Sequence, residues 1–378
     1  MAALSIRPSS APALCNALRT LVGSAVEAAR GEIAPGRRAV ATDGENSAGA
    51  ADERVLVTGA KGQIGVELVP RLRTVFGDRN IIATDLEPCE HAHVHALDVV
   101  DRDTMEGIVR RNNVTMIVHL ASLLSAVGEM KPQLALKINN KGLENVLEIA
   151  RTSCEEGRRM KVFSPSSIAA FGTSTPKDAT PDVTVMRPNT MYGVTKVFGE
   201  LLGEYYAAKY GVDYRSIRYP GIISADAPPG GGTTDYAVDI FHQALTRGQY
   251  ECFLREGTHL PMMYMDDCLK GTMMLIEADR SRLRKSTYNL ASMSICPSEL
   301  AGAIQRRIPG FSVTYKADFR EEIAQTWPRS IDDTCAREDW DWKPDFDMEA
   351  MTDVMLEKLG KKYGGEDVHT VEARASGP

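Results

Sequence analysis

The chain has 378 residues, of which 43% are hydrophobic and 25% charged, so it is long enough for two or three structural units and can bury a sizeable core. Its 44 basic and 51 acidic side chains give a formal net charge of −7, which repels a polyanion, and we expect no nucleic-acid partner. No run approaches the roughly 18 consecutive apolar residues of a transmembrane helix, so we expect no membrane partner.

The cysteines are scattered along the chain and include no Cys-x-x-Cys pair. They are Cys15, Cys89, Cys154, Cys252, Cys268, Cys296 and Cys335. An odd, unpaired set of this kind indicates neither a disulfide framework nor a zinc site. His259 and His369 also lack partners at ligand spacing, and we therefore predict no metal site.

Residues 1–52 differ in composition from the rest of the chain. Arg7 and Arg19 precede the first acidic residue, Glu27, and the stretch from Gly31 to Ala51 has no periodicity. Four apolar residues fall on one helical face: Leu14, Leu18, Leu21 and Val22. This pattern is typical of a mitochondrial transit peptide followed by a disordered linker, so we expect the mitochondrial matrix as the location. A disordered extension without address information, on a cytoplasmic protein, is the alternative.

The folded part begins with a strand, a glycine turn and a helix. The run Arg54-Val-Leu-Val-Thr58 is β-branched, and residues 66–76 read as a helix. Between them, Gly59 allows a tight turn, Gly62 lets the backbone approach a pyrophosphate, and Gly65 lets the helix pack on the strand. The predicted cofactor contacts in this turn are Gly59, Gly62, Gln63, Ile64 and Gly65.

An acidic residue stands at the spacing that a dinucleotide site requires. The next strand, residues 81–84, ends at Asp85, twenty residues after Gly65. A carboxylate there accepts hydrogen bonds from both ribose hydroxyls of NAD and repels a 2′-phosphate. The predicted cofactor is therefore NAD.

Strands and helices continue to alternate after this unit. Strands are expected at 94–97, 116–121 and 161–163, with a helix at 101–112. Repeated β-α units predict an α/β fold with a Rossmann-type doubly wound parallel sheet. Ligands of such sheets bind at the carboxyl ends of the strands. The further cofactor contacts predicted there are Asp98, Val99, Leu120, Ala121 and Ile222.

We expect four segments in the chain. Residues 1–52 form the leader and linker, and residues 53–220 form the NAD-binding domain. Residues 221–365 form a smaller, mainly substrate-binding α/β region, and residues 366–378 form a disordered tail.

A reactive pair is expected on one helix. Tyr192 and Lys196 are four residues apart, which places both side chains on the same face of a helix that runs to about Tyr210 and stops at Gly211. A phenol is a poor base near neutral pH, but a neighbouring ammonium favours its phenolate. We expect both residues to contact the cofactor and to act in catalysis.

The glycine turn, a strand-borne serine, the Tyr-x-x-x-Lys pair and the chain length together resemble the extended short-chain dehydrogenase/reductase superfamily, over about residues 54–360. Members place the catalytic serine or threonine four residues before the aromatic residue of a Tyr-Gly or Phe-Gly pair, here Phe171-Gly172. That rule selects Ser167. Ser166 is the second candidate, oriented oppositely along a strand.

Further segments are similar to the L-threonine 3-dehydrogenase branch of this superfamily. They begin at His119, Pro165, Arg187, Arg218, Pro229, Leu260 and Trp327. One departure is Asp341, where the resemblance leads us to expect glycine. The branch implies oxidation of the 3-hydroxyl of L-threonine to L-2-amino-3-oxobutanoate, with Tyr192 as general base, Ser167 as hydrogen-bond donor and NAD as hydride acceptor.

The resemblance also implies substrate contacts and an assembly. The substrate contacts are Ser125, Ser167, Tyr192, Thr233, Thr234, Asp235 and Trp327. The Thr-Thr-Asp turn would alternatively cap the helix that follows it, and Trp327 would alternatively fill the core. The expected assembly is a homodimer that pairs the helix after Asp101 and the Tyr192 helix with their symmetry mates.

Two other functions remain open. A nucleotide-sugar dehydratase is expected to carry Asp-Glu directly after its catalytic serine or threonine, whereas Ile168-Ala169 follow Ser167 here. A nucleotide-sugar epimerase is not excluded by the sequence. A non-catalytic NAD-sensing protein should lack part of the Tyr192–Lys196 pair, which is intact.

Overall fold

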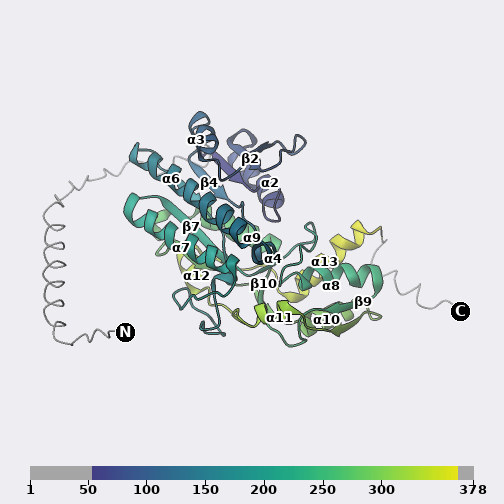
Figure 1. Ribbon diagram of the computed structural model, residues 1–378. Coiled ribbons are helices and arrows are strands. Elements are labelled where there is room, and N and C mark those ends of the chain that lie inside the picture. Colours follow the sequence, from purple (N-terminus) through teal and green to yellow (C-terminus); the bar gives the residue numbers. More distant parts are fainter. Residues whose placement is uncertain (1–52, 365–378) are drawn as a thin grey trace, which may run out of the picture. The chain divides into compact units, whose positions relative to one another are not determined.

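The fold is built on a parallel sheet, as predicted from the alternating pattern (Figure 1). The structure is a computed structural model that describes residues 53–364, and the expectations for residues 1–52 and for the tail lie outside the described residues. The strands are β1 (Val55–Thr58), β2 (Ile81–Asp85), β3 (Val94–Ala96), β4 (Met116–His119), β5 (Lys161–Phe163), β6 (Ser166–Ser167), β7 (Asp213–Tyr219) and β11 (Thr287–Asn289). Their order is β3-β2-β1-β4-β5-β7-β11, with β6 also paired to β7. The order reverses between β1 and β4, which makes the sheet doubly wound.

Helices cover both faces of this sheet because its central strands are buried on both sides. The α-helices of the described residues are α2 (Gly65–Phe76), α3 (Arg102–Arg111), α4 (Ser125–Met130), α5 (Pro132–Ala135), α6 (Gly142–Glu155), α7 (Met191–Tyr210), α8 (Tyr236–Arg247), α9 (Met265–Glu277), α10 (Pro297–Gln305), α11 (Phe319–Ala324), α12 (Thr334–Trp340) and α13 (Met348–Lys362). Leu56, Ile117 and Val162 pack with α3, α6 and α7, whereas Val55 and Val57 pack with α2, α9 and α12. The alternation of side chains along each strand produces the two cores.

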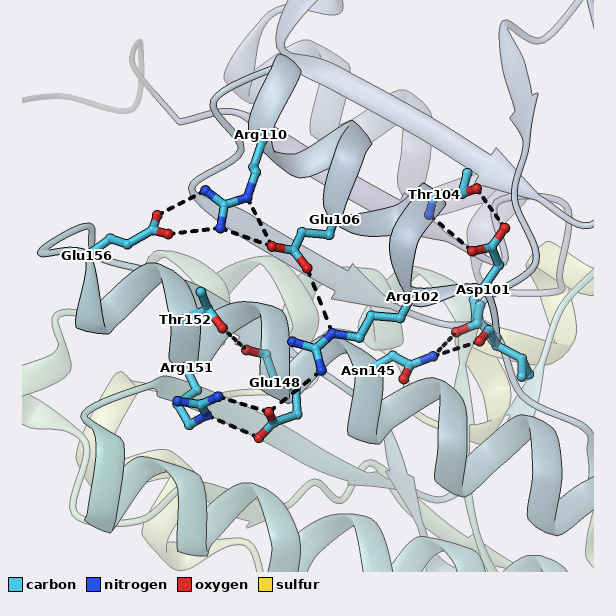
Figure 2. A network of polar contacts seen from close by, with 12 residues as sticks. Asp101, Arg102, Thr104, Glu106, Arg110, Asn145, Glu148, Arg151, Thr152 and Glu156 are labelled. Atoms are coloured by element: carbon cyan, nitrogen blue, oxygen red, sulfur yellow. Dashed lines mark hydrogen bonds and ion pairs between the residues drawn. The ribbon is translucent and has the colours of Figure 1, made fainter.

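Helices α3 and α6 are linked by charged side chains (Figure 2). Arg102 of α3 lies 3.8 Å from Glu148 of α6, and Arg110 lies 2.8 Å from Glu156, just after α6. Asn145 of α6 donates to the backbone oxygens of Val99 and Val100 at 3.0 Å. Because exposed ion pairs contribute little stability, the buried amide of Asn145 is the contact that fixes the segment after β3.

The chain between β4 and α6 departs from a simple helix. Residues Leu136–Lys141 form a π-helical segment between α5 and α6. This extra turn places the buried Asn139 side chain against two other segments: its oxygen accepts from Leu123 N (2.8 Å), and its amide donates to Thr195 Oγ1 (3.1 Å). Asn139 therefore connects the loop after β4 to helix α7.

The C-terminal region has a core of its own. Strands β8 (Gly221–Ile223), β10 (Leu260–Tyr264) and β12 (Met293–Ile295) form a second sheet, and β9 (Gln249–Cys252) pairs with β13 (Ser312–Tyr315). Helices α8, α10 and α13 pack on this core (Figure 1). The same stretch of chain also returns to the main sheet, because β11 pairs with β7, and α9 and α12 cover one face. Within residues 53–364, no helix has the length and apolar character needed to cross a membrane.

Asp341 adopts the backbone conformation for which glycine is favoured. It follows α12 with φ of 60° and ψ of 29°, in the left-handed region. Aspartate tolerates this conformation better than most residues. Its side chain lies 2.7 Å from Arg282. Asp341 therefore ends α12 in the left-handed conformation that the expected glycine would adopt.

Candidate active site

A cavity of about 440 Å³ lies at the carboxyl ends of the parallel strands. Predicted cofactor residues in its wall are Gly59, Gly62, Gln63, Ile64, Gly65, Leu120, Tyr192, Lys196 and Ile222. Predicted substrate residues in its wall are Ser125, Ser167, Thr233, Thr234, Asp235 and Trp327, besides Tyr192. Its volume is in the range of small-molecule sites. One cavity thus collects both predicted sets.

Four predicted cofactor residues are not in this wall. Asp85 lies at the end of β2, where its Oδ2 accepts from Lys61 N of the glycine turn at 2.9 Å. Asp98 accepts from Val100 N at 3.0 Å, and the Val99 side chain is buried. Ala121 lies directly behind Gly59. These residues support the turn and the strand ends that form the cavity.

The glycine turn fits a dinucleotide. Gly59 has φ of +72°, and a Cβ atom on Gly65 would lie 2.4 Å from the carbonyl oxygen of Gly59. Within the described part of the chain, the amides of Gln63 and Ile64 donate to no protein partner, and both residues border the cavity. Free amides at a helix N-terminus are donors for phosphate. The first turn of α2 would therefore hold the pyrophosphate of NAD.

Local sequence explains why Tyr192 lies in the first turn of α7. The hydroxyl of Thr190 accepts from Gly193 N at 3.1 Å and begins the helix. A Cβ atom on Gly193 would lie 2.2 Å from the oxygen of Ala169, so only glycine permits α7 to pack this closely on the turn after β6. That packing brings the Tyr192 phenol to Ser167.

The two adjacent serines face opposite sides of β6. The Ser167 side chain interacts with the Tyr192 phenol and opposes the rise of its pKa, and its Oγ accepts from Ala169 N at 3.2 Å. Ser166 is buried and donates to the carboxylate of Glu200. The geometry places Ser167, and not Ser166, beside the phenol.

The electrostatic environment separates the roles of the buried His119 and the partly buried Tyr192 and Lys196. Burial raises the pKa of Tyr192 to about 12, and the hydrogen bond with Ser167 opposes that rise. Burial lowers the pKa of Lys196 to about 8, opposed by the negative charge of Glu200. Its Nζ lies 5.2 Å from the centre of the Tyr192 ring and donates to Pro165 O at 2.8 Å. Burial lowers the pKa of His119 to about 3, so that imidazole is neutral at physiological pH.

The loop between β8 and α8 forms the wall opposite α2. The Asp235 carboxylate accepts from Gly230 N (2.6 Å) and Gly232 N (2.8 Å), and it makes no side-chain cap on α8. The capping alternative is therefore wrong for Asp235, which instead closes the glycine loop before it. Thr233 is buried and Thr234 partly buried beside the cavity.

Trp327 both packs in the core and borders the cavity. Its side chain is 6% exposed and belongs to the C-terminal core. Lys177 donates to the backbone oxygens of Thr326 (2.6 Å) and Trp327 (3.1 Å). This contact fixes the segment that carries the indole.

The expectation that His259 lacks ligand-spaced partners is wrong. His259, Cys296 and Glu299 have their ligand atoms within 4.8 Å of one another. The antiparallel pairing of β10 with β12, which puts Leu260 opposite Ile295, brings these distant positions together. Glu299 also accepts from Cys296 N at 3.0 Å as the capping box of α10, which accounts for its position.

Several parts of the site were not predicted from the sequence. Ser122, Leu124 and Val127 border the cavity, and their only signal was their place close to Ser125 in the sequence. The contact between Glu200 and Arg218 behind the site was also missed. Glu200 lies four residues after Lys196, a spacing that could have indicated it.

Comparison with known proteins agrees with this geometry. The family model described as "NAD dependent epimerase/dehydratase family" matches residues 55–291. A curated bovine (Bos taurus) relative named "L-threonine 3-dehydrogenase, mitochondrial" is 47% identical over 316 residues, covering 82% of this chain and 83% of the relative.

Solved structures give the same result. The crystal structure of L-threonine dehydrogenase from Phytophthora infestans is 55% identical, with a TM-score of 0.79, over 82% of this chain and 100% of that chain. A structure titled "Monomeric L-threonine 3-dehydrogenase from metagenome database (apo form)" is 45% identical, with a TM-score of 0.78, over 82% of this chain and 99% of that chain.

The chain belongs to the NAD dependent epimerase/dehydratase family. The Rossmann-type fold and NAD as cofactor, both predicted from the glycine turn and its surroundings, are confirmed.

Proposed function

We propose that the protein oxidises the 3-hydroxyl of L-threonine to L-2-amino-3-oxobutanoate. The observation that carries this proposal is that Ser167, Tyr192 and Lys196 line the same cavity as the free amides of the glycine turn. That arrangement supplies a base and a hydroxyl donor next to a dinucleotide site. The similar proteins named as L-threonine dehydrogenases support this substrate.

NAD, when bound, supplies the hydride acceptor. Tyr192 in its phenolate form would take the proton of the substrate hydroxyl, and the Lys196 ammonium would favour that form. Ser167 would donate to the substrate oxygen as it becomes a carbonyl. Ser167 is therefore a hydrogen-bond donor in this proposal, and Tyr192 is the general base.

The polar ends of the substrate would be held by the opposite wall. We assign the α-carboxylate to the hydroxyl of Ser125 and to Thr233 and Thr234, which border the cavity. Asp235 would act on the ammonium through its charge, because its Oδ2 already accepts two backbone amides. Trp327 would cover the small ligand.

A substrate panel tests the activity. The purified protein is incubated with NAD and, separately, L-threonine, L-serine, UDP-glucose or UDP-galactose, and NADH formation is followed by absorbance. We expect NADH with L-threonine above all other compounds. Turnover of a nucleotide sugar instead would establish the epimerase class, and NAD binding without turnover of any substrate would indicate a sensing protein.

A homodimer is proposed from the surface of α7. Val194, Phe198, Leu201 and Tyr205 form an exposed stripe on successive turns of that helix. The exposed residues of α3 are mostly charged, so we place the contact on α7 rather than on both helices. One similar structure is described as monomeric, so the mass in solution must distinguish a dimer from a monomer.

Light scattering measures the assembly. We expect a dimer mass at micromolar concentration and a monomer for Leu201→Glu. Val183→Glu, a charge at an apolar residue that is 79% exposed outside the stripe, is the matched control and should stay dimeric. A monomer mass for the unchanged protein would reject the dimer.

Mitochondrial import is proposed for residues 1–52. The basic, acid-poor start supports it, as does the name of the bovine relative, which describes that protein as mitochondrial. A fluorescent reporter fused to residues 1–52 should enter mitochondria, and the same fusion with Arg7→Glu and Arg19→Glu should not. A cytosolic signal from the unchanged fusion would contradict the address.

A further inference from the structure

A row of buried charges lies behind the reactive pair. The Glu200 carboxylate is 1% exposed and accepts from Arg218, Nη2 at 2.7 Å and Nε at 2.9 Å. Arg218 is also buried and donates to Asp182 O and to Asn289 Oδ1. Glu200 is therefore fixed in place by a guanidinium that is itself held on its other side.

Glu200 also reaches the catalytic side. It lies four residues after Lys196 on α7, and both line a cavity of about 20 Å³, which is room for one water molecule. Among the described residues that line this cavity, Lys196 and Glu200 are the charged ones. The hydroxyl of Ser166, next to Ser167 in β6, donates to the same carboxylate.

We propose that Glu200 is a positioning residue: its carboxylate, fixed by Arg218, keeps the Lys196 ammonium charged beside Tyr192 and holds Ser166 so that Ser167 faces the phenol. This inference rests on the proposed roles of Tyr192, Lys196 and Ser167. It adds to them a carboxylate that touches neither substrate nor cofactor.

The other groups around Lys196 do not supply this negative charge. His119 faces it from β4 and is neutral, because burial lowers its pKa to about 3. Tyr214 faces it from β7, and burial raises the pKa of that phenol, so it is also neutral. Arg218, on the same strand as Tyr214, is positive and would disfavour the charged form of Lys196. Tyr192 is the residue whose phenolate the Lys196 ammonium stabilises. Glu200 is thus the source of the field that stabilises the charged lysine.

The first measurement is the pH dependence of kcat/KM for L-threonine in the full chain. In Glu200→Gln, Lys196 loses its proton at lower pH, so Tyr192 is left without the neighbouring ammonium. The rising limb, in which kcat/KM increases with pH, should therefore move upward by about one pH unit or more. Glu200→Asp keeps the charge and should restore the limb. Glu204→Gln makes the same change one turn further along α7 and should leave the profile unchanged. Ser166→Ala keeps the charge, so the limb should stay while kcat falls a fewfold.

A second variant guards against a folding defect. Glu200→Gln leaves Arg218 without its charged partner, whereas Glu200→Gln with Arg218→Met removes the pair together and leaves no unpaired buried charge. Its limb should move in the same direction. A profile at the wild-type position in either variant, however low the rate, would mean that Glu200 is only structural and would overturn the proposal.

A direct measurement separates this inference from the proposed function. The Lys196 ammonium is titrated by NMR in protein labelled with ¹⁵N-lysine, with its signal assigned by comparison with Lys196→Met. The pKa of Lys196 should fall by about one unit or more in Glu200→Gln. An unchanged pKa would overturn the inference. Because no turnover is needed, failure of the unchanged protein to oxidise L-threonine would count against the proposed function alone.

Discussion

The two halves of the cavity are built from different parts of the chain. On the cofactor side, the wall is backbone: Gly59 and Gly65 lie so close to their neighbours that no side chain fits, and the free amides of Gln63 and Ile64 border the space. On the reaction side, the wall is side chains, among them those of Ser167 and Tyr192. We therefore expect added atoms on the cofactor side to weaken NAD binding, and removed atoms on the reaction side to reduce turnover.

The largest effect is expected from removing the base. Tyr192→Phe keeps the ring and its packing but deletes the proposed proton acceptor, and general base catalysis is worth about 10²- to 10⁴-fold. Turnover of L-threonine should fall by that factor while calorimetry shows NAD binding unchanged. Tyr210→Phe, at the other end of α7, is the control. Normal turnover in Tyr192→Phe would refute the mechanism.

Ser167 should come next. Ser167→Ala removes a preorganised donor to the developing carbonyl, and loss of one such donor costs about 10²- to 10³-fold in kcat. Ser167→Thr keeps the hydroxyl and should retain most activity. Ser166→Ala should be much milder, since that hydroxyl faces Glu200. If steady-state kinetics show Ser166→Ala to be the more damaging change, the assignment of the two serines is reversed.

Lys196→Met should change the pH dependence as well as the rate. Lys196, with a pKa of about 8, is charged below that pH and favours the phenolate of Tyr192, whose own pKa is raised to about 12 by burial. Without the ammonium, the pKa of the phenol rises further, so the rising limb of kcat/KM should move upward by about one pH unit or more. Profiles recorded between pH 6 and pH 10 that superimpose would contradict this role.

The smallest effect is expected on the cofactor side. A Cβ atom on Gly65 would lie 2.4 Å from Gly59 O, and such overpacking costs about 1–3 kcal/mol. Gly65→Ala should therefore weaken NAD binding by about five- to 150-fold in calorimetry. Gly257→Ala, whose Cβ would meet no atom within 4 Å, is the control. Unchanged affinity in Gly65→Ala would show that the turn is looser than its geometry implies.

The same contrast explains what the sequence could predict. The glycine turn, Asp85 and the Tyr192–Lys196 pair are local patterns, because each function depends on residues a fixed number of positions apart. The paired strands follow from such repeated units, and the predicted sheet is confirmed.

Contacts between distant segments could not be predicted in this way. The pairing of Glu200 with Arg218 depends on how helix α7 packs on strand β7, and the approach of His259 to Cys296 depends on how β10 aligns with β12. The return of β11 to the main sheet could not be predicted either, because a strand of three residues carries too little pattern to show which sheet it joins. The π-helical segment at Leu136–Lys141 also leaves no mark in hydrophobic periodicity.

The register of strand β6 decides which of its two serines faces Tyr192. It has only two residues, and they point to opposite sides, with Ser167 toward Tyr192 and Ser166 toward Glu200. A single-residue insertion or deletion just before β6 would move one serine into the place of the other and leave the second neighbour without a hydroxyl. The chemistry of this segment is thus encoded by position rather than by residue type, and even a conservative change of length here would be a change of function.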